Sequence, residues 1–407
     1  MAGSMTTQVC VATERRWGFS VSCGVLGWVL DAYSFFVPLF LLDSLAKHFA
    51  VSKSAIVATV TATLVMRPFG AFLFGWLSDR WGRKYPLMAC ILWFSAITAV
   101  MPFAPSFRIF VLLRALYGIG LGGYWGVGAA LVMETCPVRW RGLFSGILQA
   151  GYSAGYLLAA LAACMMEPKL GWPLMFLVTL IVAGGIMLLL LPSVEPTRTA
   201  STPGTDFHPW TILGTHWQGF VALTILMTVI TCLSHGTQDL YPDFLMMVHG
   251  YSNQKVAELA IIYNFGAGLG AIAFGRLSDR LGRKNSIYCA MSLCLLALPA
   301  WAFGRSFWIL ALGSFVMQAG VQGAFGVVPA YLNEQSPSHA RSFFAGLSYQ
   351  LGMFFGAPCV IVEYAFRDWL GYGGALAVFE GCVFIALALV LLGIRERPSG
   401  LIPAASS

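Results

Sequence analysis

The run SHGTQDLYPDF at 234–244 places polar and ionisable side chains inside an otherwise apolar stretch. On a helix, Thr231, His235 and Asp239 are spaced i, i+4 and i+8 and would form one stripe along a single face. Imidazole titrates near physiological pH, and a neighbouring carboxylate can accept or release a proton. The pattern predicts proton coupling or substrate contact; the alternative is a fixed polar contact between helices. Pro242 is expected to kink this helix.

Three further ionisable side chains, those of Asp31, Arg67 and Arg114, lie inside apolar runs. Ionisable residues at membrane depth are functional candidates by default. Asp31 is expected to carry a proton, to pair with a buried arginine, or to form a structural hydrogen bond. Arg67 remains charged when buried and its planar guanidinium fits a carboxylate, so we expect it to bind an anionic substrate or to pair permanently with Asp31. Arg114 opens a glycine-rich run suited to close helix packing.

Polar residues at helical spacing on other apolar runs are weaker candidates for substrate contact. Each has the alternative of an ordinary packing or anchoring role. They are Gln149, Tyr152 and Tyr331. Gln238 instead lies beside the His235–Asp239 stripe and is expected to offer a hydrogen bond to the substrate.

The composition indicates an all-α membrane protein. Of 407 residues, 58% are hydrophobic and only 10% are charged, whereas soluble domains carry about 25% charged residues. Apolar runs of about 20 residues, each long enough to cross a bilayer, recur along the chain. The twelve predicted spans are 18–41, 55–77, 85–104, 108–132, 143–165, 172–192, 218–246, 256–277, 285–303, 307–331, 343–364 and 374–394.

The net charge of +7 is explained by membrane topology. Most Lys and Arg residues fall on one side of the predicted spans, which by the positive-inside rule places both termini in the cytoplasm. We therefore expect no nucleic-acid partner, and a multi-pass protein of the plasma (inner) membrane without a cleaved signal peptide. The ten cysteines have no ligand spacing, which predicts neither a disulfide framework nor a metal or other cofactor.

The chain contains an internal repeat. GWLSDRWGRK at 75–84 returns as GRLSDRLGRK at 275–284, an offset of 200 residues, and a weaker pair follows at 126–142 and 326–342. Repeats of this kind divide transporters into two halves. The predicted domains are a six-helix bundle at 1–192, a cytoplasmic linker at 193–216 and a second six-helix bundle at 217–407.

The charged residues of both repeats are expected to form a gating latch, made in one conformation and broken in the other. For one copy alone, charges that only orient the chain would be an equal explanation, but two copies favour the latch. Its predicted members are Asp79, Arg83, Asp279, Arg283, Glu134, Glu334, Arg141 and Arg341.

The duplicated G-x-L-S-D-R-x-G-R-K loop resembles the signature loop of the major facilitator superfamily. The resemblance covers the whole chain and implies two pseudo-symmetric six-helix bundles that rock around a central site. In that superfamily an arginine before a glycine-rich run is associated with proton coupling, which is the context of Arg114. The family fold implies alternating access, and we expect a monomer.

The run at 234–239 carries a narrower resemblance, to the lactate/pyruvate:proton symporter branch of the sialate:proton symporter family. That pattern reads N-x-x-[S/T]-H-x-[S/T]-Q-D, and Thr231 stands where it has Asn. The resemblance implies binding roles for the second-helix arginine, here Arg67, and an eleventh-helix glutamine, here Gln350. It also makes Tyr152 the candidate for a fifth-helix aromatic position.

The expected function is proton-coupled symport of small monocarboxylates such as lactate and pyruvate, the partners being an organic acid anion and a proton. One alternative is symport of a larger acid, such as sialate or an aromatic carboxylate. A metabolite-sensing receptor would need an output domain, and the tails offer none. An enzyme is not expected, because H-E-x-x-H does not occur and the one His–Asp pair has no obvious nucleophile partner.

Overall fold

A computed structural model describes the backbone of residues 2–192 and 208–394, with side chains from Trp17 onward. Every regular element in this part of the chain is helical. Most of the predicted linker, residues 193–207, lies outside the described residues. Its last residues are helical, because α9 begins at Pro209, and α9 has a kink at His216, where the predicted linker ends.

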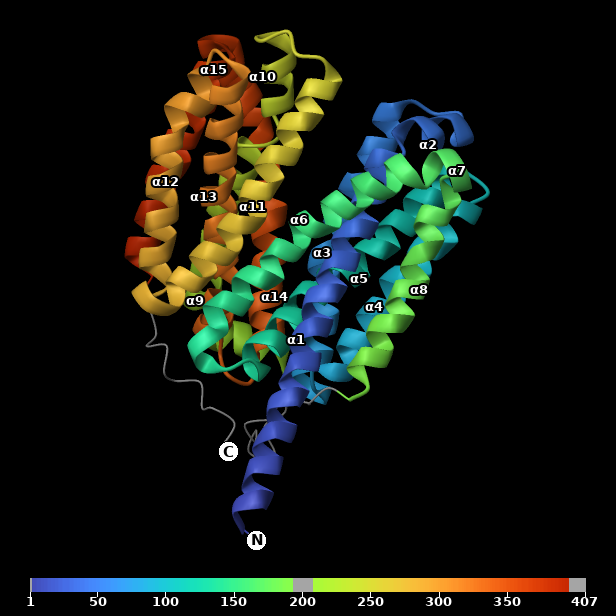
Figure 1. The fold of residues 1–407 in the computed structure, drawn as a ribbon, viewed down its shortest axis with the longest axis vertical. Helices are drawn as coiled ribbons and strands as arrows, with labels where there is room; N and C mark the ends of the chain where they lie inside the picture. The colour runs from blue at the N-terminus through green and yellow to red at the C-terminus, as the bar shows by residue number, and fades with distance from the viewer. Residues whose placement is uncertain (1, 193–207, 395–407) are drawn as a thin grey trace.

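The first half of the chain forms one bundle, drawn in blue to green in Figure 1. Its elements are α1 (Ala2–Phe40), α2 (Leu42–Phe49), α3 (Lys53–Trp81), α4 (Lys84–Val100), η1 (Met101–Phe103), α5 (Phe107–Thr135), η2 (Val138–Trp140), α6 (Arg141–Met165), α7 (Glu167–Leu170) and α8 (Pro173–Leu190).

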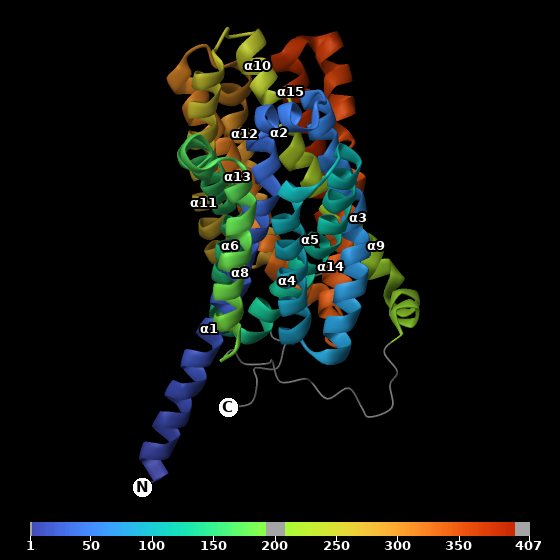
Figure 2. The same ribbon diagram turned by 90° about the vertical axis from the view of Figure 1, so that its right-hand side faces the viewer.

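The second half forms the other bundle, drawn in yellow-green to red in Figures 1 and 2. Its elements are α9 (Pro209–Gly236), α10 (Tyr241–Met247), α11 (Asn253–Leu281), α12 (Arg283–Phe303), α13 (Phe307–Gln335), α14 (Arg341–Gly356) and α15 (Cys359–Gly393).

Eleven helical stretches in the described chain are long and apolar enough to cross a membrane. The last of them, Arg341–Gly393, has 53 residues and contains two of the predicted spans. Within α15 the backbone leaves the helical conformation at Gly371, where φ is +70°, a value that favours glycine. Two helical segments result, which reconciles the eleven stretches with twelve transmembrane helices.

Glycines set the closest helix contacts. A Cβ on Gly122 of α5 would lie 2.6 Å from the Cα of Arg67 on α3. The same closeness occurs between the halves, where a Cβ on Gly126 would lie 2.7 Å from the Cα of Gly346. Such spacing excludes any side chain, so these helices pack backbone to backbone.

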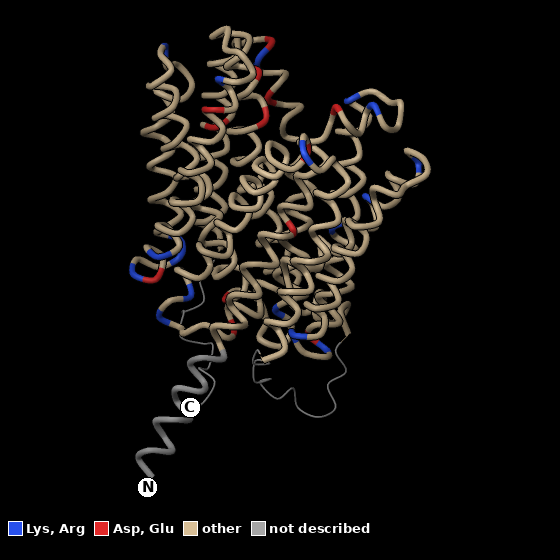
Figure 3. The backbone as a smooth tube through the Cα atoms, turned by 45° about the vertical axis from the view of Figure 1, so that its right-hand side comes forward, with Lys and Arg blue, Asp and Glu red and all other residues tan. Residues whose placement is uncertain are grey.

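The two halves touch at one end of the molecule and diverge toward the other (Figure 1). We call the touching end the basic end and define it by Arg83, Arg141, Arg283 and Arg341; the opposite end is the far end. Charged residues gather at the two ends and are sparse between them (Figure 3). This is the charge distribution expected when the middle of a protein lies in lipid.

Candidate functional site

The predicted His235–Asp239 pair is formed. His235 Nδ1 lies 2.8 Å from Asp239 Oδ2, and the Asp239 backbone N–H donates to the His235 carbonyl at 2.8 Å. The two side chains are 28% and 36% exposed, although both residues belong to a predominantly apolar stretch. The pair can therefore exchange protons with water.

The backbone around this pair differs from the single kinked helix that the sequence predicted. Helix α9 ends at Gly236, and α10 begins at Tyr241 with Pro242 in its first turn. Proline is well tolerated there because the first turn lacks intrahelical partners for its N–H groups. The break thus precedes Pro242, and irregular backbone at membrane depth is typical of functional positions.

Thr231 lies one helical turn before His235 on α9 and is a packing residue. It is fully buried, and its hydroxyl donates to the Met227 carbonyl at 2.6 Å. Its Cβ packs against Gly356, where an added Cβ would lie 2.7 Å away. Thr231 and His235 keep the i, i+4 spacing on α9, but Thr231 packs against α14 and is closed to water.

Gln238 belongs to a polar network with α13. Its side-chain amide donates to Ser234 Oγ at 3.1 Å and to Gln318 Oε1 at 3.2 Å. Gln318 in turn donates to Thr237 Oγ1 at 2.9 Å. These contacts tie the broken segment to α13, so the Gln238 amide is engaged within the second half.

Arg67 lies on α3 in the first half and is only 6% exposed. Its Nε has no hydrogen-bond partner, and the structure does not contain the ion pair with Asp31 that we considered. Its charge interacts electrostatically with Asp31, Tyr152 and His235. A buried guanidinium without a carboxylate partner is suited to bind an anion.

Asp31 and Arg114 lie close together in the first half without pairing. Tyr117 donates to the Asp31 backbone carbonyl at 2.9 Å, and Asp31 Oδ2 has no partner. All three guanidinium nitrogens of Arg114 also lack hydrogen-bond partners. Its guanidinium lies 5.2 Å from the Tyr117 ring centroid and 5.8 Å from that of Phe35, where cation–π attraction stabilises its charge.

Gln350 and Gln149 approach Arg67 from neighbouring helices. Gln350 donates to the carbonyl of Gly122 at 3.3 Å, and Gly122 packs on the Arg67 backbone. Gln149 is 4% exposed and interacts with Tyr349. The Oε1 atoms of both glutamines lack partners. The structure thus gathers these predicted residues around one region between the halves.

Tyr152 also borders that region. Its ring stacks on Trp28 with centroids 5.9 Å apart and meets Phe36 edge-on at 5.2 Å. Tyr331 lies elsewhere: it is fully buried next to Ala330, near the basic end of α13. From its place in the helix, Tyr331 lies more than about 10 Å from the level of Arg67, and the structure does not group it with the other candidates.

Two buried glutamates were missed by the sequence reasoning. Glu363 and Glu380 of α15 are both 0% exposed, and none of their carboxylate oxygens has a hydrogen-bond partner. Glu380 lies inside the predicted span 374–394, so the rule that singled out Asp31 also applied to it. Glu363 lies at the end of the predicted span 343–364, where a solvent-exposed position was the default.

The first copy of the predicted latch is assembled at the basic end. Arg83 Nε and Nη2 each donate to Glu134 at 3.0 Å, and Arg83 also pairs with Asp79. Asp79 accepts the backbone N–H groups of Ser342 at 3.2 Å and Phe343 at 2.8 Å. These N–H groups belong to the first turn of α14, so Asp79 joins one half to the other.

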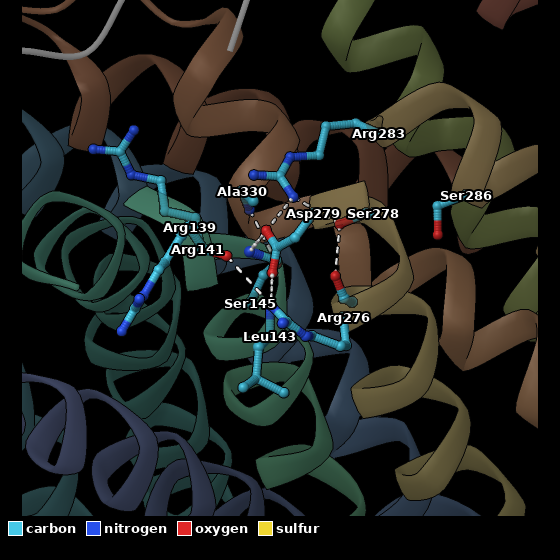
Figure 4. Close-up of polar contacts among 12 residues, drawn as sticks. Arg139, Arg141, Leu143, Ser145, Arg276, Ser278, Asp279, Arg283, Ser286 and Ala330 are labelled. Carbon is cyan, nitrogen blue, oxygen red and sulfur yellow. Dashed lines mark hydrogen bonds and ion pairs between the residues drawn. The ribbon is translucent and has the colours of Figure 1, made fainter. Parts of the chain in front are cut away.

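The second copy repeats this arrangement in the opposite direction (Figure 4). Arg283 donates to Glu334 at 3.0 and 2.7 Å and to Asp279 at 3.0 Å. Asp279 points at the start of α6 and accepts the N–H groups of Gly142 at 2.6 Å and Leu143 at 3.0 Å. A carboxylate at a helix N-terminus is stabilised by the helix dipole as well.

The two copies differ at one arginine. Arg341 crosses between the halves and donates to Glu134 at 3.3 Å. Its counterpart Arg141 donates to the Met133 carbonyl at 3.0 Å within its own half. Glu334 interacts with Arg141 only at longer range.

Burial alone would lower the pKa of the Arg83 guanidinium, but the charges of Glu134 and Asp79 raise it above its ordinary value. Arg83 therefore stays charged, and any loss of this network with pH must come from its carboxylates.

Comparison with known proteins identifies relatives that are named as transporters and a solved structure with a similar fold. The chain is 27% identical to the "Carboxylic acid transporter protein homolog" of Saccharomyces cerevisiae, over 94% of this chain and 68% of the relative. It is 27% identical to the "Niacin transporter NiaP" of Acinetobacter baylyi, over 92% and 93%. The solved structure of the proton:xylose symporter XylE superposes with a TM-score of 0.77 at 18% identity, covering 95% of this chain and 98% of that chain; at this identity the likeness concerns the fold alone.

A family model, the Major Facilitator Superfamily, matches residues 24–357 and again 240–406. These matches include the duplicated loops and the site described above. The chain belongs to the Major Facilitator Superfamily.

Proposed function

We propose that this protein is a proton-coupled carrier of organic acid anions that works by alternating access. The observation that supports this most directly is that a cation of the first half and a titratable group of the second half lie in the same region between the halves. Arg67 in the first half is a buried, unpaired cation, and it interacts electrostatically with the titratable His235 of the second half. An anion bound at Arg67 and a proton bound at the His235–Asp239 pair would lie in the same region.

The proposed cycle follows from the cost of burying charge. Positive-inside bias places the basic end and both termini in the cytoplasm, so a molecule closed there is ready to load from outside. Asp239 or His235 takes up a proton, and a carboxylate binds Arg67 with hydrogen bonds from Gln350. Loading leaves little net charge in the site, which lowers the desolvation cost of closing the halves around it. The latch at the basic end then opens.

Two substrate classes are candidates. The S-H-x-T-Q-D run favours small monocarboxylates such as lactate and pyruvate. The relatives, named for carboxylic acids and for niacin, support larger acids better, including aromatic carboxylates. Trp28, Phe36 and Tyr152 supply aromatic surface beside Arg67 that suits such a ring.

The test is uptake of labelled lactate, pyruvate, sialate and nicotinate into proteoliposomes, with and without an imposed pH gradient. We expect an inwardly directed proton gradient to drive accumulation of at least one acid, with nicotinate transported better than lactate. Accumulation of none of these acids, or accumulation indifferent to the pH gradient, would refute the proposal.

A further inference from the structure

Two carboxyl groups in the second half are buried without any partner. Glu363 and Glu380 lie at nearly equal distances along the chain on either side of Gly371, which brings them near each other on adjoining helical segments. They interact electrostatically with one another. Neither has an exposed side chain, and all four oxygens lack hydrogen bonds.

The surroundings of these carboxyls supply no positive charge. Glu380 faces Cys232 of α9 and Cys294 of α12, and Glu363 faces Asp239 in the segment between α9 and α10. Among the described residues, no Lys or Arg forms an ion pair with either glutamate. Charge compensation by a basic side chain is therefore not available to them.

Glu380 is packed against α9 at the proton-coupling pair. Gly236, the residue after His235, has no side chain, and a Cβ there would meet the Glu380 carboxylate and lie 2.6 Å from Phe379 Cδ1. The absence of a side chain at Gly236 is what admits the carboxyl to this position. Glu363 is instead within electrostatic reach of Asp239.

An isolated carboxylate in such surroundings would cost several kcal/mol, so both groups are expected to be neutral and to hold protons. A metal ion is a poor alternative, because no group of three or more His, Cys, Asp or Glu side chains in the described chain could hold one. Protons are the cations that these two side chains fit.

We propose that Glu363 is a second proton-carrying residue of the transport cycle, exchanging with the His235–Asp239 pair, while Glu380 keeps its proton throughout. When Glu363 returns ionised from the opposite side, a proton enters at Asp239, whose side chain reaches water, and passes to the Glu363 carboxylate, which restores the neutral state. Asp239 is then ionised again and accepts another proton before the halves close. On release, Asp239 and Glu363 give up their protons on the opposite side, and Glu380 keeps its own.

This inference rests on the proposed function and makes a claim about stoichiometry. The measurement is the ratio of proton flux, from a pH-sensitive dye inside proteoliposomes, to labelled acid flux, for whichever of nicotinate and lactate the wild type accumulates more. We expect a ratio of about 2 in the wild type and about 1 in Glu363→Gln, because the variant removes one of the two groups that carry a proton. Glu380→Gln, which mimics a permanently protonated group, is the matched control and should retain the wild-type ratio.

The outcomes separate the two claims. A wild type that couples protons to acid with an unchanged ratio in Glu363→Gln would overturn the role of Glu363 and leave the proposed function standing. A wild type without pH-driven uptake would refute the proposed function itself. If Glu363→Gln does not fold, as judged by gel filtration and thermal unfolding, Glu363→Asp keeps a carboxyl and should keep the ratio; a ratio of about 1 in the wild type would overturn the inference.

Discussion

The two halves have the same charged contacts at the basic end but different ionisable residues between the two ends. Each half carries the same Asp–Arg–Glu arrangement at the basic end, and each aspartate caps a helix of the opposite half. Between the ends, the first half holds unpaired arginines, whereas the second half holds His235, Asp239 and two unpaired glutamates. The charged contacts at the basic end are therefore duplicated, whereas the ionisable residues between the ends differ from one half to the other.

This division has a physical reason. Permanent pairing of Arg67 with a carboxylate on its own half would satisfy both charges and leave nothing for a substrate to compensate. In the proposed cycle, the cation lies in one half and the proton carriers lie in the other, so a neutral site depends on loading. The duplicated contacts would then serve the motion, and the residues that differ between the halves would serve binding.

The largest expected effect comes from removing the cation of the first half. Arg67→Gln should raise the KM for acid uptake roughly 100-fold or more, because loss of a buried charge partner costs about 2–5 kcal/mol. Uptake measured over a range of acid concentrations tests this. Arg67→Lys keeps the charge but loses the planar guanidinium, so its KM should lie between those of the wild type and Arg67→Gln. An unchanged KM in Arg67→Gln would remove the anion site from the first half.

The next effect concerns the second half. Asp239→Asn should lose pH-driven accumulation but keep exchange of labelled for unlabelled acid, because exchange needs no net proton movement. A gradient of one pH unit supplies about 1.4 kcal/mol per coupled proton, so the wild type should accumulate acid roughly tenfold or more and the variant should only equilibrate. Normal accumulation by Asp239→Asn would place the proton carrier elsewhere.

The sequence predicted the two copies of the latch more completely than it predicted the site between the halves. Asp79, Arg83, Glu134 and their counterparts were identified from two copies at one offset, and a repeat fixes a shared geometry. The structure adds that each aspartate binds backbone N–H groups of the other half. Almost every residue has a backbone N–H group, so the residue types do not indicate which of these groups binds the aspartate, and these contacts could not be predicted.

Some residues of the site were predicted correctly and others were not. A local sequence pattern does not determine the depth of a residue in the membrane or the neighbouring helix that it faces. His235 and Asp239 are four residues apart, and their contact follows from local geometry alone. Thr231 follows the same spacing, but its contact with α14, which is distant in sequence, could not be predicted from the local run. Tyr331 was grouped with the site by residue type, whereas its depth depends on how far α13 extends toward the basic end.

The difference between the two latch copies gives a smaller effect. Arg341→Gln removes an ion pair between the halves, while Arg141→Gln removes only a bond within one half. Because Glu134 keeps its two bonds to Arg83, the loss should be about 1–2 kcal/mol. Spin labels at Lys47 and Lys255, in a cysteine-free background, should report a larger population closed at the far end in Arg341→Gln than in Arg141→Gln. Equal shifts in both variants would make the two copies equivalent.

The smallest effect tests packing rather than charge between the halves. Gly126→Ala would place a Cβ 2.7 Å from the Gly346 Cα, closer than real side chains approach, so the basic end should separate slightly. Gly268→Ala is the matched control, because nothing lies within 4 Å of its added Cβ and alanine favours a helix by roughly 1 kcal/mol over glycine. We expect Gly126→Ala to lower the thermal midpoint and change the label distances, and Gly268→Ala to raise the midpoint or leave it unchanged. If both variants behave alike, close backbone packing at Gly126 does not hold the halves together, and the polar contacts between them, including those of Asp79, Asp279 and Arg341, must do so.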